Sequence, residues 1–265
     1  MIGKKIRIDR IKDKKSNKFI ILPIDHGVTY GPIHGIRDIK QVVEWAVNGG
    51  ATAIVEHKGM VVPGYRGKGK DIGLIVHLSA STYLSPHPDT KTIVGTVEEA
   101  VKLGADAVSV HVNIGDTNEK EMLKDLGEIS KKASNWGMPL LAMIYARGKS
   151  VTNEYDKKLV AHCARLGAEL GADIVKVPYT GNVESFAEVV NSTPIPVIIA
   201  GGEKMDSVKE LINVVAGAIK AGAAGISIGR NIFQSDKPEN LLSILSKIVK
   251  ESLSAEEAYQ NLLIS

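Results

Sequence analysis

The stretch Gly171-Ala172-Asp173-Ile174-Val175-Lys176-Val177 holds the pattern that decides the fold. Glycine favours the left-handed backbone just past a helix, and the apolar run after it predicts a short buried β-strand. Similar junctions begin at Gly50, Gly104 and Gly222. Two interpretations of this repeat stay open. It reflects the even-numbered strands of a closed barrel, or only the general preference for glycine between a helix and a strand.

Outward from this junction, apolar runs and helical periodicities alternate along the chain. Strands are expected at residues 19–23, 52–55, 74–78, 107–112, 140–145, 173–177, 196–200 and 225–228. Helices are expected at residues 36–47, 97–103, 119–135, 155–170, 183–191, 208–221 and 239–250, and residues 92–94 form a short β-prone piece. This alternation implies parallel strands joined by crossovers. An open doubly wound sheet would also fit, but eight strands in 265 residues favour a single-domain (β/α)8 TIM barrel over residues 1–265.

Both ends of the chain extend beyond the predicted barrel. Residues 1–18 are rich in lysine and arginine, and we predict a solvated segment there rather than a polyanion site, because no aromatic residues are interleaved. Residues 251–265 are expected to form an extra C-terminal helix, since Ser254 and Glu257 have the spacing of a capping box.

Composition narrows the class of protein. The net charge of +3 is too mild for a nucleic-acid binder, and Cys163 is the only cysteine, which excludes a disulfide framework. Apolar runs long enough for a membrane span are missing, and we predict neither a signal peptide nor a membrane partner. The sequence therefore indicates a cytoplasmic globular protein.

Lys176 is the residue of greatest chemical interest, because an ammonium group among isoleucine and valine is costly to bury. Losing the proton relieves that cost and leaves a nucleophilic amine, so we hypothesise that Lys176 forms a Schiff base with a carbonyl substrate. A buried ion pair with Asp25 is the alternative. Lys58 is a rival nucleophile, but its more polar loop favours a substrate or phosphate contact.

Two further side chains are expected to assist Lys176 at the carboxyl ends of the strands, where TIM-barrel sites lie. Asp25 can accept a proton from a substrate hydroxyl, and Tyr145 can donate one. The alternatives are a turn-forming role for Asp25 before Gly27 and a rim-closing aromatic role for Tyr145.

The glycines after the last two strands predict a phosphate site. Gly201-Gly202 follows the seventh strand, and Gly229-Arg230 follows the eighth, where a short extra helix is expected. Bare backbone N–H groups can approach a phosphate there, and Arg230 can add a bidentate contact. Two tight turns with an exposed arginine are the alternative. A metal site at His57, His77 and His111 is not expected, because they show no short-spaced ligand motif.

The sequence resembles the archaeal class I aldolases of the DeoC/FbaB family over essentially its whole length. The resemblance rests on residues 23–28, 57–59, 136–140, 145–148, 171–176, 200–202 and 229–234. It implies Lys176 as the Schiff-base lysine, Asp25 as proton acceptor and Tyr145 as proton donor. It further implies substrate contacts from His26, Gly27, Val28, Thr29, Ala146, Arg147, Gly201, Gly202, Gly229 and Arg230.

The resemblance also implies an activity. It points to transfer of a three-carbon methyl-ketone unit from 6-deoxy-5-ketofructose 1-phosphate to L-aspartate semialdehyde, in an alternative route to 3-dehydroquinate and the aromatic amino acids. A fructose-1,6-bisphosphate aldolase is the alternative, with Arg147 and Lys149 as a second phosphate site, and a non-catalytic sugar-phosphate binding protein is a third reading. No cofactor and no metal are implied, and the expected assembly is a homo-oligomer, often a decamer in the family.

Two departures from the family pattern bear on the substrate. Ala146 stands where the family usually has proline, which loosens the backbone beside Tyr145. The segment Ser79-Ala80-Ser81 replaces a pair of glycines and is expected to bring side chains to the mouth of the barrel.

Overall fold

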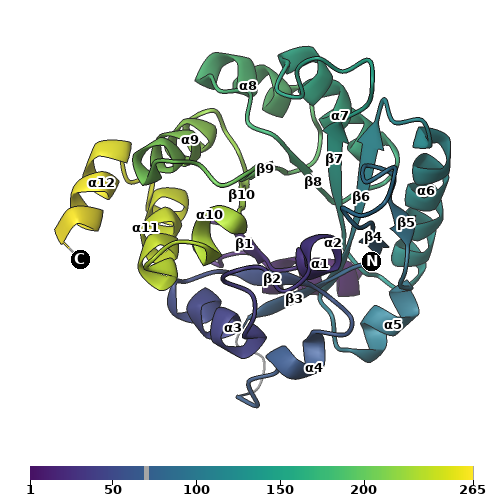
Figure 1. Cartoon of the computed structure of the whole chain (residues 1–265), viewed down its shortest axis with the longest axis horizontal. Coiled ribbons are helices and arrows are strands. Elements are labelled where there is room, and N and C mark those ends of the chain that lie inside the picture. The colour runs from purple at the N-terminus through teal and green to yellow at the C-terminus, as the bar shows by residue number, and fades with distance from the viewer. Residues whose placement is uncertain (69–71, 265) are drawn as a thin grey trace.

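A closed barrel of eight parallel strands forms the centre of the protein (Figure 1), in a computed structural model that describes residues 1–68 and 72–264. Its strands are β1 (Phe19–Pro23), β2 (Ala53–His57), β3 (Gly73–His77), β6 (Ala107–Ile114), β7 (Leu140–Ala146), β8 (Ile174–Val177), β9 (Val197–Ala200) and β10 (Gly225–Ser227). β1 pairs with both β2 and β10, which closes the ring. The predicted (β/α)8 TIM barrel is confirmed, and the open sheet is excluded.

Helices surround this ring on its outer side (Figure 1). Those expected from the sequence are α3 (Ile39–Asn48), α5 (Val97–Lys102), α6 (Glu119–Asn135), α7 (Lys157–Glu169), α8 (Val183–Asn191), α9 (Val208–Lys220) and α11 (Pro238–Glu251). Two of them begin later than predicted because an aspartate caps the N-terminus. Asp38 accepts a hydrogen bond from the Gln41 backbone N–H at 3.0 Å, and Asp156 accepts bonds from the first turn of α7.

Smaller elements complete the fold. Three short helices are α2 (Gly27–Tyr30), α4 (Val61–Gly64) and α10 (Arg230–Phe233), and the C-terminal helix is α12 (Ala255–Ile264). α12 begins with the predicted capping box, in which Glu257 Oε2 accepts the Ser254 backbone N–H at 3.0 Å. The β-prone piece at residues 92–94 contributes β5 (Thr92–Ile93), which pairs with β4 (Ser79–Ala80) beside the barrel mouth.

The strands send alternate side chains to two separate cores. Inside the barrel, Phe19, Ile21, Ile174 and other inward residues form one cluster. The intervening residues pack outward against the helices in a larger cluster. Because the period is two, Lys176 follows Ile174 into the barrel, two residues nearer the mouth.

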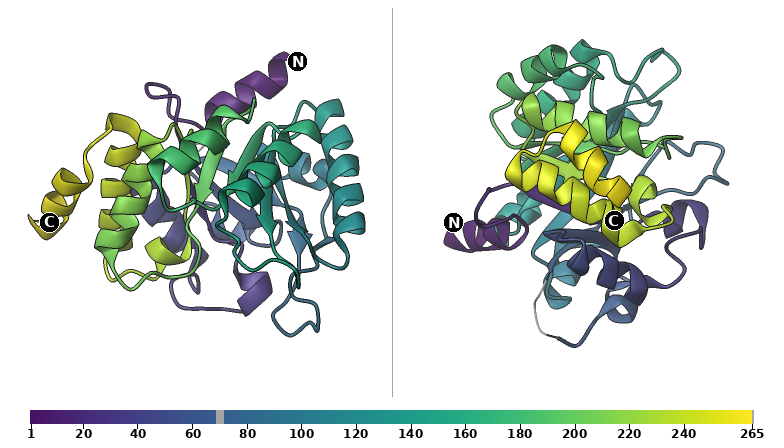
Figure 2. Two further views of the ribbon diagram at one scale, coloured as in Figure 1. Left: turned by 90° about the horizontal axis from the view of Figure 1, so that it is seen from above. Right: turned by 90° about the vertical axis from the view of Figure 1, so that its left-hand side faces the viewer.

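The N-terminal segment forms a helix without a buried residue, and some of its basic side chains contact the barrel. Residues Ile2–Arg10 form α1, which lies at the end of the barrel opposite α2 and the loop between β4 and β5 (Figure 2). Lys4 pairs with Asp173 at 2.9 Å and Arg10 with Asp106 at 3.6 Å, each carboxylate standing just before a strand. These ion pairs attach two of the basic residues to the barrel, while Lys5, Lys14 and Lys15 are exposed. Buried Ile11, just after the helix, packs in the inner core.

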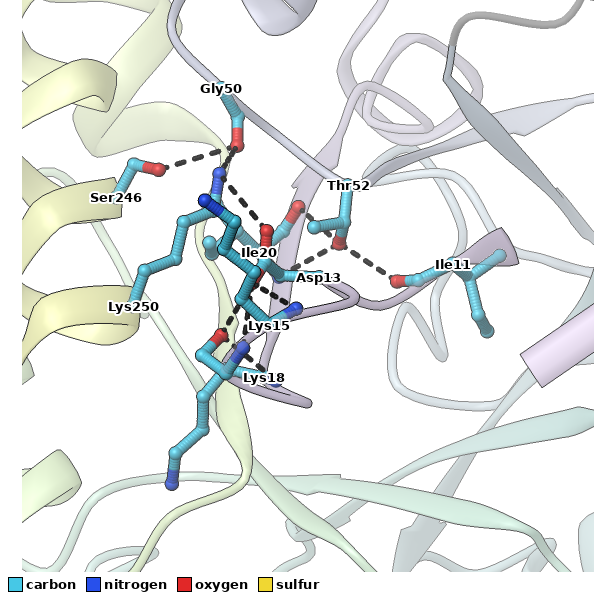
Figure 3. A network of polar contacts seen from close by, with 10 residues as sticks. Ile11, Asp13, Lys15, Lys18, Ile20, Gly50, Thr52, Ser246 and Lys250 are labelled. Atoms are coloured by element: carbon cyan, nitrogen blue, oxygen red, sulfur yellow. Dashed lines mark hydrogen bonds and ion pairs between the residues drawn. The ribbon is translucent and has the colours of Figure 1, made fainter. Parts of the chain in front are cut away.

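A polar network fastens the chain after α1 to the same end of the barrel (Figure 3). The Thr52 hydroxyl donates to the Ile11 carbonyl at 2.8 Å and accepts the Ile20 backbone N–H at 3.0 Å. The Lys250 ammonium donates to the Gly50 carbonyl at 2.8 Å, joining α11 to this network. The site at the other end is therefore built on a closed and braced scaffold.

The glycine repeat at Gly50, Gly104, Gly171 and Gly222 has one physical cause, since all four adopt φ values between 76° and 98°. A residue with a side chain would be strained there. In the described part of the chain, no helix combines the length and the apolar character needed to cross a membrane.

Candidate active site

Lys176 lies inside the barrel on β8, beside Met143 of β7 in the strand register. Its side chain is 7 % exposed and forms no hydrogen bond or ion pair within residues 1–68 and 72–264. Burial lowers its pKa to about 8, the positive charges of Arg147 and Arg230 act in the same direction, and Asp25 opposes them. A substantial fraction of Lys176 is therefore an uncharged amine near neutral pH.

Asp25 follows β1 and reaches the same cavity, among several histidines. Its Oδ2 lies 3.8 Å from His77 Nε2, and its Oδ1 lies 3.6 Å from His26 Nδ1. Burial raises the pKa of Asp25, but the positive charges that His77, His26 and Lys176 can carry outweigh this and lower it to about 2. Burial lowers the pKa of both histidines to about 4. At neutral pH the site thus holds an ionised carboxylate beside neutral imidazoles.

Tyr145 enters the cavity from β7 and packs against two neighbours. The guanidinium carbon of Arg147 lies 4.5 Å from the centre of its ring, and the His111 ring lies 4.9 Å from it. Burial raises the pKa of Tyr145, so the phenol keeps its proton across the physiological range. Tyr145 can donate a proton, which is what an oxygen leaving a carbinolamine requires.

Three glycines and Arg230 form the part of the cavity after β9 and β10. A Cβ added at Gly201 would lie 2.6 Å from Ile228, and Gly202 has φ of 66°, so side chains are unfavourable at both. The Arg230 guanidinium donates to the Gly202 carbonyl at 2.9 Å, while its Nε is buried without a partner. An unsatisfied buried donor is costly, so this atom is suited to an anionic ligand.

The cavity has a volume of about 160 Å³ and collects most of the residues predicted for the site. Those lining it are Asp25, His26, Thr29, Tyr145, Arg147, Lys176, Gly201, Gly202, Gly229 and Arg230. Gly27, Val28 and Ala146 are not brought into this lining. Ala146 follows Tyr145 on the strand and therefore packs outward, against the helices. These three substrate contacts stay predictions.

The structure adds residues that the sequence analysis did not propose. Lys91, in the loop between β4 and β5, lines the cavity, and so does Ser227 at the end of β10, whose Oγ is buried without a partner. Inward alternation along β10 could have indicated Ser227, but nothing local marks Lys91. The segment Ser79-Ala80-Ser81 also lines the cavity, as its departure from the family pattern predicted.

Two lysines considered from the sequence lie outside the cavity lining. Lys58 pairs with Glu99 at 2.6 Å and is not part of the cavity lining. Its ranking below Lys176 therefore agrees with the geometry, and its expected role as a substrate contact does not. Lys149 is exposed and is likewise outside the lining, so it does not partner Arg147 in a second anion site.

His57, His77 and His111 do line one cavity, although they come from different strands. His77 Nδ1 shares a hydrogen bond with Ser109 at 2.8 Å, and His111 Nε2 shares one with Asn113 at 2.9 Å. The described residues contain no group of three or more His, Cys, Asp or Glu placed to hold a metal ion.

Comparison with known proteins gives consistent matches. The family model described as DeoC/LacD family aldolase matches residues 19–235. The 2-amino-3,7-dideoxy-D-threo-hept-6-ulosonate synthase 1 of Archaeoglobus fulgidus is 46% identical, covering 98% of this chain and 96% of that protein. The corresponding synthase of Halobacterium salinarum is 40% identical over 97% and 95%. An archaeal fructose-1,6-bisphosphate aldolase, with its catalytic lysine bound to a carbinolamine intermediate, superposes with a TM-score of 0.87 at 31% identity, covering 93% of this chain and 99% of that one.

Proposed function

Because this chain belongs to the DeoC/LacD family of aldolases, we propose that it breaks and forms carbon–carbon bonds through a Schiff base on Lys176. The observation that carries the proposal is the buried Lys176 amine, with its pKa lowered to about 8, in one cavity with ionised Asp25 and protonated Tyr145. A nucleophile, a proton acceptor and a proton donor are the groups that this chemistry needs.

The proposed reaction is that of 2-amino-3,7-dideoxy-D-threo-hept-6-ulosonate synthase, the name of the two relatives at 46% and 40% identity. The donor is 6-deoxy-5-ketofructose 1-phosphate, and the acceptor is L-aspartate semialdehyde. The protein thus acts as a transaldolase at the start of an alternative route to 3-dehydroquinate.

In the proposed mechanism, the Lys176 amine adds to the C5 ketone of the donor. The carbinolamine oxygen takes a proton from Tyr145 and leaves as water, giving a protonated imine. Asp25 accepts the proton of the C3 hydroxyl while the C3–C4 bond breaks. The electron pair of that bond moves into the protonated imine. A phosphorylated aldehyde departs, and a three-carbon enamine stays on Lys176.

The second half of the reaction reverses these roles. The enamine carbon attacks the aldehyde carbon of aspartate semialdehyde, and the new alkoxide takes a proton back from Asp25. Water then adds to the imine carbon and releases the product ketone with the free Lys176 amine. Both half-reactions use the same three side chains, so no second catalytic set is needed.

We assign the donor phosphate to Gly201, Gly202, Gly229 and Arg230. The unpartnered Nε of Arg230 and the bare backbone of the glycines support this assignment, because a phosphate offers several acceptor oxygens at close range. Among the described residues that line the cavity, Lys91, Arg147, Lys176 and Arg230 are basic, and Asp25 is the single carboxylate. This excess of positive charge suits an anionic substrate.

A fructose-1,6-bisphosphate aldolase is the second candidate, favoured by the similarity to solved aldolases of that activity at 31% identity. The two candidates share the Schiff base and differ in the acceptor. We also propose, from the family resemblance, that the protein is a homo-oligomer, which sedimentation velocity would test.

Product analysis distinguishes the two candidates. The protein is incubated with 6-deoxy-5-ketofructose 1-phosphate and aspartate semialdehyde, and separately with fructose 1,6-bisphosphate alone. The proposal predicts the seven-carbon amino ketose in the first mixture, with at least about tenfold lower kcat/KM for cleavage in the second. Efficient cleavage of the bisphosphate without formation of the amino ketose would instead support the second candidate.

A further inference from the structure

Lys91 occupies a position in the cavity that the mechanism above leaves without a role. It lines the same cavity as Lys176 and Arg147, from the loop between β4 and β5. Its ammonium donates to the Ser81 hydroxyl and to the Pro88 carbonyl, the latter at 3.0 Å. A lysine ammonium has three N–H donors, so one is left to face a ligand. These two bonds hold the long side chain in place before any substrate arrives.

Arg147 supplies a second cation beside Lys91. Its guanidinium stacks on Tyr145, and its Nε donates to Glu154 at 2.8 Å. The terminal N–H groups of Arg147 make no hydrogen bond to the described part of the chain. Burial lowers the pKa of Lys91, and the positive charge of Arg147 acts in the same direction, so the two cations lie close enough to interact.

Carboxylates surround this cation pair. Asp89 and Asp116 interact electrostatically with Lys91, and Glu154 is bonded to Arg147. A second phosphate dianion would meet two cations together with three negative charges. A single carboxylate suits the same surroundings better, because it carries less negative charge than a phosphate dianion and can still face both cations that line the cavity.

The chemistry of the exchange calls for such a second position. The departing and the entering aldehyde must place their reactive carbons at the same point beside the enamine. Their tails differ, since one carries a phosphate and the other an amino acid group. The tails can diverge from that shared point, one toward Arg230 and the other toward Lys91.

On the basis of the function proposed above, we propose that Lys91 and Arg147 bind the α-carboxylate of an amino-acid aldehyde acceptor, separately from the phosphate position at Arg230. Lys91 thereby selects the acceptor, and it takes no part in forming the imine. The observation behind this assignment is the prepositioned Lys91 ammonium beside Arg147 in the lining of the catalytic cavity.

The test compares acceptors in the Lys91→Met and Lys91→Arg variants. The protein receives the ketose phosphate donor with either aspartate semialdehyde or its amide, 2-amino-4-oxobutanamide, in which a neutral carboxamide replaces the carboxylate. Loss of one charge-assisted hydrogen bond is expected to raise the KM for aspartate semialdehyde about 10- to 100-fold in Lys91→Met. The KM for the amide should change less than about threefold, and Lys91→Arg should restore part of the preference. Lys149→Met, which removes an exposed lysine outside the cavity, is the matched control and should behave like the wild type.

A second measurement separates this inference from the proposed function. Borohydride reduction with the donor alone reports imine formation, and its yield should be similar in the wild type and in Lys91→Met. An unchanged KM for aspartate semialdehyde, with a normal imine yield, would overturn the role of Lys91 and leave the proposed function intact. An equal rise in KM for both acceptors, or a lower yield of the reduced donor imine, would also overturn it. Lys91 would then have a structural role or contribute to binding of the donor. A wild-type protein that forms the imine but rejects aspartate semialdehyde would overturn the role of Lys91 and the proposed transaldolase reaction, and would leave only the Schiff base on Lys176.

Discussion

The lowered pKa of Lys176 makes a quantitative prediction about the pH dependence of imine formation. With a pKa of about 8 in place of the ordinary 10.5, roughly one lysine in ten is an amine at pH 7, about 300 times the fraction at the ordinary value. The rate of imine formation should therefore rise about tenfold per pH unit below pH 7. It should level off above a pH of about 8, because the amine is then the main form.

The assay is a single-turnover reaction with the ketose phosphate donor, quenched with borohydride and measured by intact-protein mass spectrometry between pH 5.5 and 10.5. Circular dichroism at each pH verifies that the protein stays folded. A rate that keeps rising tenfold per unit up to pH 10 would refute the reasoning, since it would mean that burial does not perturb the pKa of Lys176.

Asp25→Asn sharpens this test. The Asp25 carboxylate raises the pKa of Lys176 against the effect of burial. Removing that negative charge should move the bend of the rate profile to lower pH, while cleavage of the donor slows because the proton acceptor is lost. A bend that moves to higher pH would contradict the electrostatic account.

Three further predictions concern stability and turnover. Lys176→Met should raise the free energy of unfolding at pH 7 by up to about 3 kcal/mol, because it removes a buried ammonium group. The folded pKa of about 8 lies below the ordinary 10.5, so the stability of the wild type should rise between those pH values. The stability of the variant should not, and urea titrations at pH 7 and 10 would show the difference. Tyr145→Phe should lower kcat about 10²- to 10⁴-fold with little change in the donor KM, measured by steady-state kinetics, and a loss confined to KM would contradict a proton-donor role. Glu56 on β2 is 2 % exposed, and burial raises its pKa from 4.5 to about 7, so the stability of the wild type should fall as the pH rises between those values. Glu56→Gln should therefore raise the free energy of unfolding by up to about 3 kcal/mol at pH 8 and by little at pH 4.5. An equal gain in urea titrations at both pH values would contradict the raised pKa.

Much of the barrel follows from local patterns in the sequence. Buried strands such as Ile174–Val177 stand out as apolar runs, and the glycines before four of them mark left-handed helix ends. Helix starts were less predictable, because capping by Asp38 and Asp156 depends on one side chain rather than on periodicity. The closure of the sheet depends on pairing between β1 and β10, which lie about two hundred residues apart in sequence (Phe19 with Gly225).

The N-terminal segment shows a limit of local patterns. Its basic residues predict a solvated segment, and α1 has no buried residue, but Lys4 and Arg10 also pair with Asp173 and Asp106 at the base of the barrel. Those contacts join residues up to 169 positions apart. Charge patterning alone cannot reveal a partner at that distance in the chain.

The residues of the candidate site were likewise predictable only in part. Lys176, Asp25 and Tyr145 were found because each stands at the end of a predicted strand, where a barrel places its chemistry. Lys91 was missed because it lies in a loop, and only the fold brings it to the cavity. Ala146 was included for its place in a motif, although strand alternation turns its side chain to the outer core.

The central claim is that Lys176 carries the covalent intermediate, and mapping of the reduced adduct tests it most directly. The wild-type protein and a Lys58→Met control are incubated with the ketose phosphate donor, reduced with borohydride, digested and analysed by tandem mass spectrometry. The account predicts a three-carbon adduct on Lys176 in both proteins and none in Lys176→Met. Retained activity without an adduct at Lys176, or an adduct on Lys58 in the wild type, would contradict it.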